Sequence, residues 1–147
     1  MSSAKGLCFS LDKPLISVST LESLSLQVKI ENGFIVPMSD ARRLEIYSAI
    51  FDANHLQIRD IQAQILDESS FLDFLEKDKV YFIGTGVEKT KSIIKHKNAV
   101  FIENKLPSAN EMGLISFNKF SNKNFENVAY FEPLYLKDFI SLSQTKS

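Results

Sequence analysis

The chain has 147 residues, 44% of them hydrophobic and 24% charged, a balance typical of one globular domain with a real core. Its 17 basic and 18 acidic side chains give a formal net charge of −1, so no overall positive field favours direct binding of nucleic acid. The absence of a long apolar run or a signal peptide predicts a cytoplasmic protein with no membrane partner.

The first residues predict the end of a helix. Leu7, Cys8 and Leu11 fall on one helical face within residues 4–11, and Pro14 stops that helix shortly afterwards. No cap or acidic first turn precedes this pattern, so we expect the helix, and a larger part of the fold, to begin before residue 1. The single cysteine, Cys8, is expected to be a small buried hydrophobe.

A strand and a second helix follow. Residues 15–19 form an apolar run that predicts a short buried strand. Ser19 and Glu22 form a capping box for a helix that is expected to end at Gly33. Its buried stripe consists of Leu21, Leu24 and Val28.

The next part predicts three consecutive antiparallel strands. These lie at residues 34–38, 44–51 and 56–65, and the alternation of the third slips at Asp60 and Ile61, which indicates a bulge. Helices at 68–77 and 87–95 then alternate with strands at 80–83 and 99–102, and a capping box of Ser108 and Glu111 opens a last helix. The apolar side chains expected to face inward are Phe71, Leu72, Phe74 and Leu75 in the first of these helices and Met112, Ile115 and Phe120 in the last.

This α/β order, β-β-β-α-β-α-β-α, resembles a ribonuclease-H-like lobe of the actin, Hsp70 and sugar-kinase superfamily. In that superfamily two such lobes face each other with a nucleotide between them. We therefore expect residues 1–32 to be the helix-strand-helix end of a first lobe. Residues 33–140 would form the second lobe, and residues 141–147 a polar tail.

Gly84, Thr85 and Gly86 connect a predicted strand to a predicted helix, where backbone amides can receive a phosphate. The segment lacks the dinucleotide fingerprint, because Lys89 stands where the third glycine belongs, and it lacks P-loop spacing. A vestigial nucleotide site at Gly84 and Gly86 is one interpretation. A tight turn that needs glycine is the favoured one.

The first hairpin carries Asp40 followed by Ala41, Arg42 and Arg43. A nucleotide-using relative would place glycines after this aspartate, so that bare backbone could wrap the phosphates. Side chains fill that space here, and we expect the loop to be disabled for ATP hydrolysis. Arg42 and Arg43 could pair with phosphate, or they could form a solvated or partner-facing patch.

Nothing in the spacing predicts a metal site or a catalytic group. The two histidines, His55 and His96, form no ligand pair, and the acidic Asp67 and Glu68 are explained by helix capping. We therefore expect no catalytic residue, no metal and no cofactor. Residues 129–140 are strongly apolar and predict either a closing segment on the core or an adhesive surface for a partner.

Five segments together resemble the bacterial TsaB (YeaZ) family: SAKGLCFSLDKPLISVSTLE, DARRLEIYSAIFD, FIGTGVEKTK, LPSANEMGLISF and FEPLYLKDF. The resemblance covers nearly the whole chain. It implies a noncatalytic, glycoprotease-like (peptidase M22-like) subunit of the machinery that installs threonylcarbamoyl on adenosine 37 of ANN-decoding tRNAs. Such a subunit binds the catalytic paralogue TsaD and, through it, the ATPase TsaE, and meets tRNA only indirectly.

The resemblance also implies that first-lobe helices make the homodimer and TsaD contacts, of which this chain keeps only residues 4–11. Leu7, Phe9 and Leu11 would then form an exposed apolar patch that favours self-association, and TsaD binding would be weak or absent. Two alternatives stay open. One is a nucleotide-binding protein that uses the Gly84–Gly86 turn with Arg42 and Arg43, and the other is a glycoprotease-like hydrolase.

Overall fold

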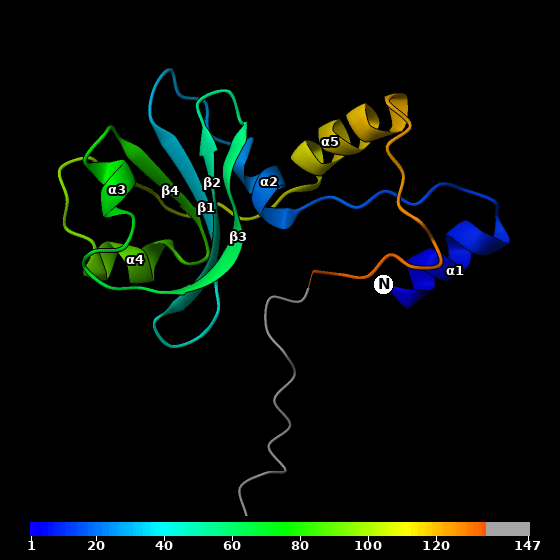
Figure 1. Ribbon diagram of the computed structural model, residues 1–147, viewed down its shortest axis with the longest axis horizontal. Helices are drawn as coiled ribbons and strands as arrows, with labels where there is room; N and C mark the ends of the chain where they lie inside the picture. Colours follow the sequence, from blue (N-terminus) through cyan, green and yellow to red (C-terminus); the bar gives the residue numbers. More distant parts are fainter. Residues whose placement is uncertain (135–147) are drawn as a thin grey trace, which may run out of the picture.

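A computed structural model of the chain describes residues 1–134 (Figure 1). Its centre is one five-stranded sheet with the order β3-β2-β1-β4-β5. β1 pairs antiparallel with β2, and β2 with β3, whereas β1–β4 and β4–β5 are parallel. The strands are β1 (Phe34–Asp40), β2 (Glu45–Asp52), β3 (Gln57–Ile65), β4 (Val80–Gly84) and β5 (Ala99–Ile102).

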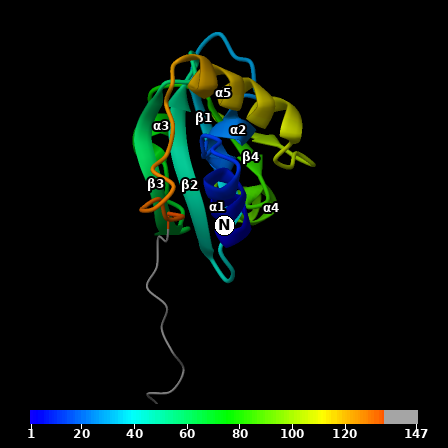
Figure 2. The ribbon, with the colours of Figure 1, turned by 90° about the vertical axis from the view of Figure 1, so that its right-hand side faces the viewer.

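Helices cover both faces of the sheet. α3 and α4 pack on one face, α2 packs on the other with α5 beside it, and α1 lies outermost on the α2 side (Figure 2). The helices are α1 (Ser2–Ser10), α2 (Thr20–Ser25), α3 (Leu72–Leu75), α4 (Val87–Ile93) and α5 (Ala109–Ser121). The predicted order β-β-β-α-β-α-β-α is confirmed.

The sheet separates two apolar cores. Met38, Ile46 and Phe82 belong to the core under α3 and α4, while Ile35 and Ile83 belong to the core under α2. β1 and β4 therefore contribute to both cores. This explains why their sequences are continuous apolar runs and do not alternate with polar residues.

The predicted bulge in β3 is confirmed. Ser48 pairs with Gln62 and Ile50 pairs with Arg59, so β3 has one more residue than β2 between these pairs, at Asp60 and Ile61. The extra residue bends the edge strand and increases its local twist.

The predicted buried strand at residues 15–19 is wrong. Among these residues only Leu15 pairs, through an isolated antiparallel bridge to Glu126. The segment runs outside the sheet toward α2, and Leu15 is its buried residue. An apolar run of five residues therefore reflects one anchoring side chain here, not a strand with neighbours on both sides.

Several helix predictions were too long or too apolar. α3 begins only at Leu72, because Phe71 has a left-handed φ of 66° that cannot continue a helix, and this leaves Leu72 exposed. In α5 only Ile115 is buried, while Met112 and Phe120 are exposed. Cys8 is half-buried, not buried, because α1 packs no side chain into a core.

No helix within residues 1–134 is long and apolar enough to span a membrane.

Candidate functional site

The two motifs singled out in the sequence meet at the carboxyl ends of two parallel strands. β1 ends at Asp40 and β4 ends at Gly84, and these strands are neighbours, with Met38 in register with Gly84. The backbone N–H of Asp40 donates to Oγ1 of Thr85 at 3.0 Å. The hairpin and the glycine turn are therefore one site, which we call the hairpin–turn site: residues 40–45 and 84–89.

A lysine from α4 occupies the centre of this site. Nζ of Lys89 lies 2.8 Å from Oδ1 of Asp40 and donates a second hydrogen bond to the carbonyl oxygen of Glu45 at 3.0 Å. The backbone N–H of Arg42 donates to the same Asp40 oxygen at 2.7 Å. The Lys89 hydrogen bond, followed by the Arg42 amide, holds the pKa of the Asp40 carboxyl below its usual value.

The glycines of the turn face the chain's own atoms. Gly84 has a φ of 116°, and a Cβ there would overlap the Met38 carbonyl oxygen and lie 2.7 Å from Cδ2 of Leu24. A Cβ at Gly86 would meet the side chains of Ile46 and Met38 at 3.1 Å. Close packing therefore accounts for both glycines, as the tight-turn interpretation supposes.

The hairpin arginines adopt a backbone conformation that glycine prefers. Arg42 and Arg43 have φ values of 71° and 48°, and both side chains are exposed. The loop backbone therefore has the left-handed conformation that glycine adopts without strain, and the loop exposes two guanidinium groups to solvent.

The apolar residues of α1 form a second, separate surface. Leu7, Phe9 and Leu11 are 60%, 84% and 61% exposed. α1 is held by Lys5, whose Nζ donates to the carbonyl oxygens of Ala129 and Phe131 at 3.0 and 3.1 Å. The predicted patch is therefore accessible, and among the described contacts α1 shares no hydrogen bond with the hairpin–turn site.

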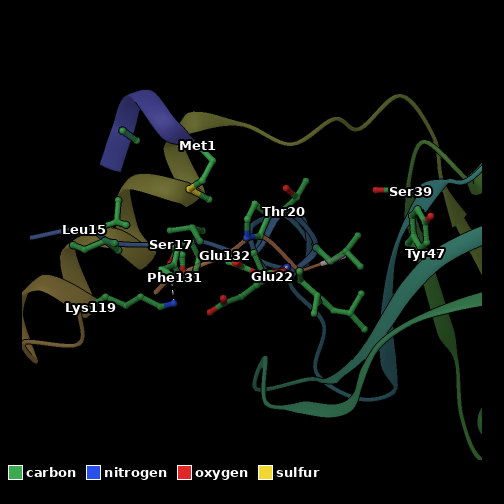
Figure 3. Close-up of a pocket in the computed structure, with 18 residues that line it drawn as sticks. Met1, Leu15, Ser17, Thr20, Glu22, Ser39, Tyr47, Lys119, Phe131 and Glu132 are labelled. Carbon is green, nitrogen blue, oxygen red and sulfur yellow. Dashed lines mark hydrogen bonds between the residues drawn. The ribbon is translucent and has the colours of Figure 1, made fainter. Parts of the chain in front are cut away.

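A large cleft was not predicted from the sequence. It has a volume of about 1180 Å³ and lies between α1, the segment that leads into α2 and the open face of β2 and β3 (Figure 3). Lys119 of α5 hydrogen-bonds the segment that leads into α2, because its Nζ donates to the carbonyl oxygen of Ser17 at 2.9 Å. The Ser17 hydroxyl in turn donates to Glu126. Its lining comes from segments more than 100 residues apart, so no sequence spacing could reveal it.

Neither histidine belongs to a metal-like cluster. Within the described residues, no group of three His, Cys, Asp or Glu side chains could hold a metal ion. Nδ1 of His96 accepts a hydrogen bond from the backbone N–H of Asn98 at 3.2 Å. The helix-capping prediction for Asp67 and Glu68 is wrong: the Asp67 carboxylate accepts bonds from Ser69 and Ser70 within a turn, and the N-cap of α3 is Phe71. Part of the apolar segment 129–140 lies outside the described residues.

Comparisons with known proteins agree with one another. A model of the family described as "TsaD: tRNA N6-adenosine threonylcarbamoyltransferase" matches residues 1–141. The Bacillus subtilis (strain 168) "tRNA threonylcarbamoyladenosine biosynthesis protein TsaB" is 35% identical over 95 residues, which are 63% of this chain and 42% of that protein.

Two solved Pseudomonas aeruginosa structures share the fold. One, of an uncharacterized protein similar to peptidase YeaZ, has a TM-score of 0.75 at 17% identity, and the other, YeaZ, has a TM-score of 0.70 at 19% identity. Each match covers 92% of this chain but only 65% and 64% of the solved chains. The ribonuclease-H-like fold is thereby confirmed, and the chain spans less than two thirds of the length of these relatives.

Proposed function

The chain belongs to the TsaD family of tRNA N6-adenosine threonylcarbamoyltransferases and, within it, to the TsaB/YeaZ proteins, and from this premise we propose that it is a noncatalytic scaffold in tRNA threonylcarbamoyladenosine biosynthesis. In this role it binds a TsaD-type catalytic paralogue and, through that pair, a TsaE-type ATPase. The tRNA that carries adenosine 37 meets the scaffold only indirectly, in line with the net charge of −1.

The lysine at the centre of the hairpin–turn site carries the noncatalytic part of the proposal. In a nucleotide-using relative, the aspartate at this position is followed by glycines that leave room for phosphates. Here the ammonium group of Lys89 and the amide of Arg42 already engage the Asp40 carboxylate. Because an internal cation satisfies this carboxylate, the site offers little to a bound nucleotide and its metal ion.

The scaffold part of the proposal is supported by exposed surface. A helix that exposes Leu7, Phe9 and Leu11 without burying any residue is typical of a protein contact. We propose that this helix belongs to the end of a first lobe, residues 1–32, followed by a second lobe at 33–140 and a tail at 141–147. Arg42 and Arg43 form a second candidate contact, suited to an acidic partner surface.

A threonylcarbamoyl-transfer assay on an ANN-decoding tRNA tests the proposed role. The chain alone, supplied with a threonylcarbamoyl donor and divalent metal, is expected to modify no tRNA. The TsaD-type paralogue must be present for any product to form. Product formed by the chain alone, and lost on mutation of Asp40 to Asn, would show that the site is catalytic.

A further inference from the structure

The hairpin between β1 and β2 carries a second, smaller cavity, which we call the hairpin cavity. It has a volume of about 600 Å³ and lies at the end of the sheet from which this loop projects (Figure 1). Ile65 reaches the cavity from the edge strand because it pairs with Glu45 across β2 and β3. The residues that line the hairpin cavity are Ala41, Arg42, Arg43, Leu44, Glu45 and Ile65.

Part of the hairpin cavity is aliphatic. Leu44 and Ile65 are 55% and 70% exposed, and both line the cavity. The backbone N–H of Leu66 donates to the carbonyl oxygen of Leu44 at 2.7 Å, which fixes the end of β3 beside the loop. Two exposed aliphatic residues at one cavity offer a place for an apolar side chain of a partner.

The hairpin cavity is also cationic. Arg42 and Arg43 are exposed, and within residues 1–134 neither guanidinium group forms an ion pair. Asp40, two residues before Arg42, is already engaged by Lys89. Guanidinium groups bind carboxylates through paired N–H donors, so the cavity has unmet capacity for anionic groups.

The hairpin holds its arginines on a fixed backbone. The N–H of Ala41 donates to the carbonyl oxygen of Glu45 at 3.0 Å, and the N–H of Glu45 donates to the carbonyl oxygen of Arg42 at 3.1 Å. The left-handed φ values of 71° and 48° at Arg42 and Arg43 are costly for residues with a Cβ, and backbone strain of this kind concentrates at ligand-binding positions. A loop fixed in advance also lowers the ordering cost of binding.

We propose that the hairpin cavity binds an extended acidic segment of a partner protein. Carboxylates of the segment pair with Arg42 and Arg43, and one aliphatic side chain of the segment packs on Leu44 and Ile65. The aliphatic part of the cavity favours such a peptide over RNA, because an RNA backbone presents phosphates and sugars but no aliphatic side chain. This inference rests on the proposed scaffold role and adds to it the chemistry of one partner segment.

Fluorescence anisotropy with a fluorescein-labelled peptide EEDLDEE tests the charged contact. Arg42→Asn with Arg43→Asn should weaken binding by the full chain at least about tenfold, and asparagine tolerates the left-handed backbone of the loop. The matched Lys95→Asn with Lys97→Asn removes two exposed positive charges outside the hairpin cavity. This control should leave the affinity nearly unchanged.

A second peptide, EEDSDEE, tests the aliphatic contact. It should bind the parent chain several-fold more weakly than EEDLDEE, and Ile65→Ser should remove this difference. Ile58→Ser, on the same strand but outside the hairpin cavity, should keep it. Both isoleucines are exposed, so neither substitution is expected to unfold the chain.

Four results would overturn the proposal: no binding of EEDLDEE, equal losses with the arginine and lysine variants, no effect of the leucine, or tighter binding of a labelled oligouridine RNA of the same length. The assay contains no TsaD-type paralogue. Its failure would therefore leave the scaffold role standing on α1, whereas failure of the scaffold role would appear in a titration with the paralogue.

Discussion

Nζ of Lys89 lies 2.8 Å from Oδ1 of Asp40, although 49 residues separate them in the sequence. The pair joins the end of β1 to the first turn of α4, across the turn formed by Gly84, Thr85 and Gly86. In this junction the ammonium group of Lys89 neutralises the Asp40 carboxylate, and this pairing is the physical argument for the proposed noncatalytic role.

Lys89→Met is expected to lower the free energy of unfolding by about 1 kcal/mol or less, because Asp40 is partly exposed and solvent screens the pair. The variant removes the hydrogen bond to Asp40 and the one to the Glu45 carbonyl. Urea midpoints at pH 6 measure the loss. Lys91→Met, which removes the more exposed pair with Glu103, is the control and should cost less.

The effect of Lys89→Met should also depend on pH. The folded state holds the pKa of Asp40 below its ordinary 3.8, so the stabilisation is present above that value and is lost as pH falls through the lower folded pKa. The difference between parent and variant is therefore full at pH 6 and shrinks below about pH 4. An unchanged difference at pH 3 would mean that Lys89 acts through packing alone.

Arg43→Gly should stabilise the chain by about 0.5–1 kcal/mol, because Arg43 has a φ of 48° and a left-handed backbone is costly for a residue with a Cβ. Thermal unfolding should show a midpoint higher by about 2–4 °C per kcal/mol. Arg43→Ala removes the same charge but keeps the strain and should give no such gain. Equal gains from both substitutions would point to charge repulsion instead.

Two glycine substitutions should have opposite signs. Gly84→Ala should cost about 3 kcal/mol or more, since its Cβ would overlap the Met38 carbonyl at a left-handed φ. Gly113→Ala should add about 1 kcal/mol, because Gly113 lies within α5 and a Cβ there meets nothing within 4 Å. Urea titration of both variants checks the prediction, and a mild effect at Gly84 would show that the turn is looser than described.

Nucleotide should not stabilise the chain. A ligand at a hundred times its dissociation constant adds about 2.7 kcal/mol to the free energy of unfolding, a shift that thermal unfolding detects easily. We expect no measurable rise in the midpoint with ATP or ADP and magnesium, in the parent or in Lys89→Met. A clear rise, abolished by Arg42→Ala with Arg43→Ala, would favour the nucleotide-binding alternative.

The sequence was sufficient for the five strands of the sheet, because they leave apolar or alternating runs and the β3 bulge leaves a slip in alternation. The same apolar signal wrongly predicted a strand at residues 15–19, where only Leu15 forms an isolated bridge. It was insufficient where one residue decides the backbone, as at Phe71, whose left-handed φ shortens α3. The hairpin and the glycine turn were recognised separately, but their union through Lys89 depends on β1 and β4 being neighbours. That adjacency comes from tertiary structure, and no spacing in the sequence encodes it.

The scaffold role is tested most directly by calorimetric titration of the chain into its TsaD-type paralogue. We expect weak binding, with a Kd of about 1 μM or weaker, since the chain spans less than two thirds of the length of the relatives it matches. Leu7→Gln with Phe9→Gln should weaken it at least about tenfold, or 1.4 kcal/mol. Leu114→Gln with Phe117→Gln, at equally exposed positions of α5, should leave it unchanged. Absence of any binding, or loss of binding only with the α5 variant, would contradict a scaffold that uses α1.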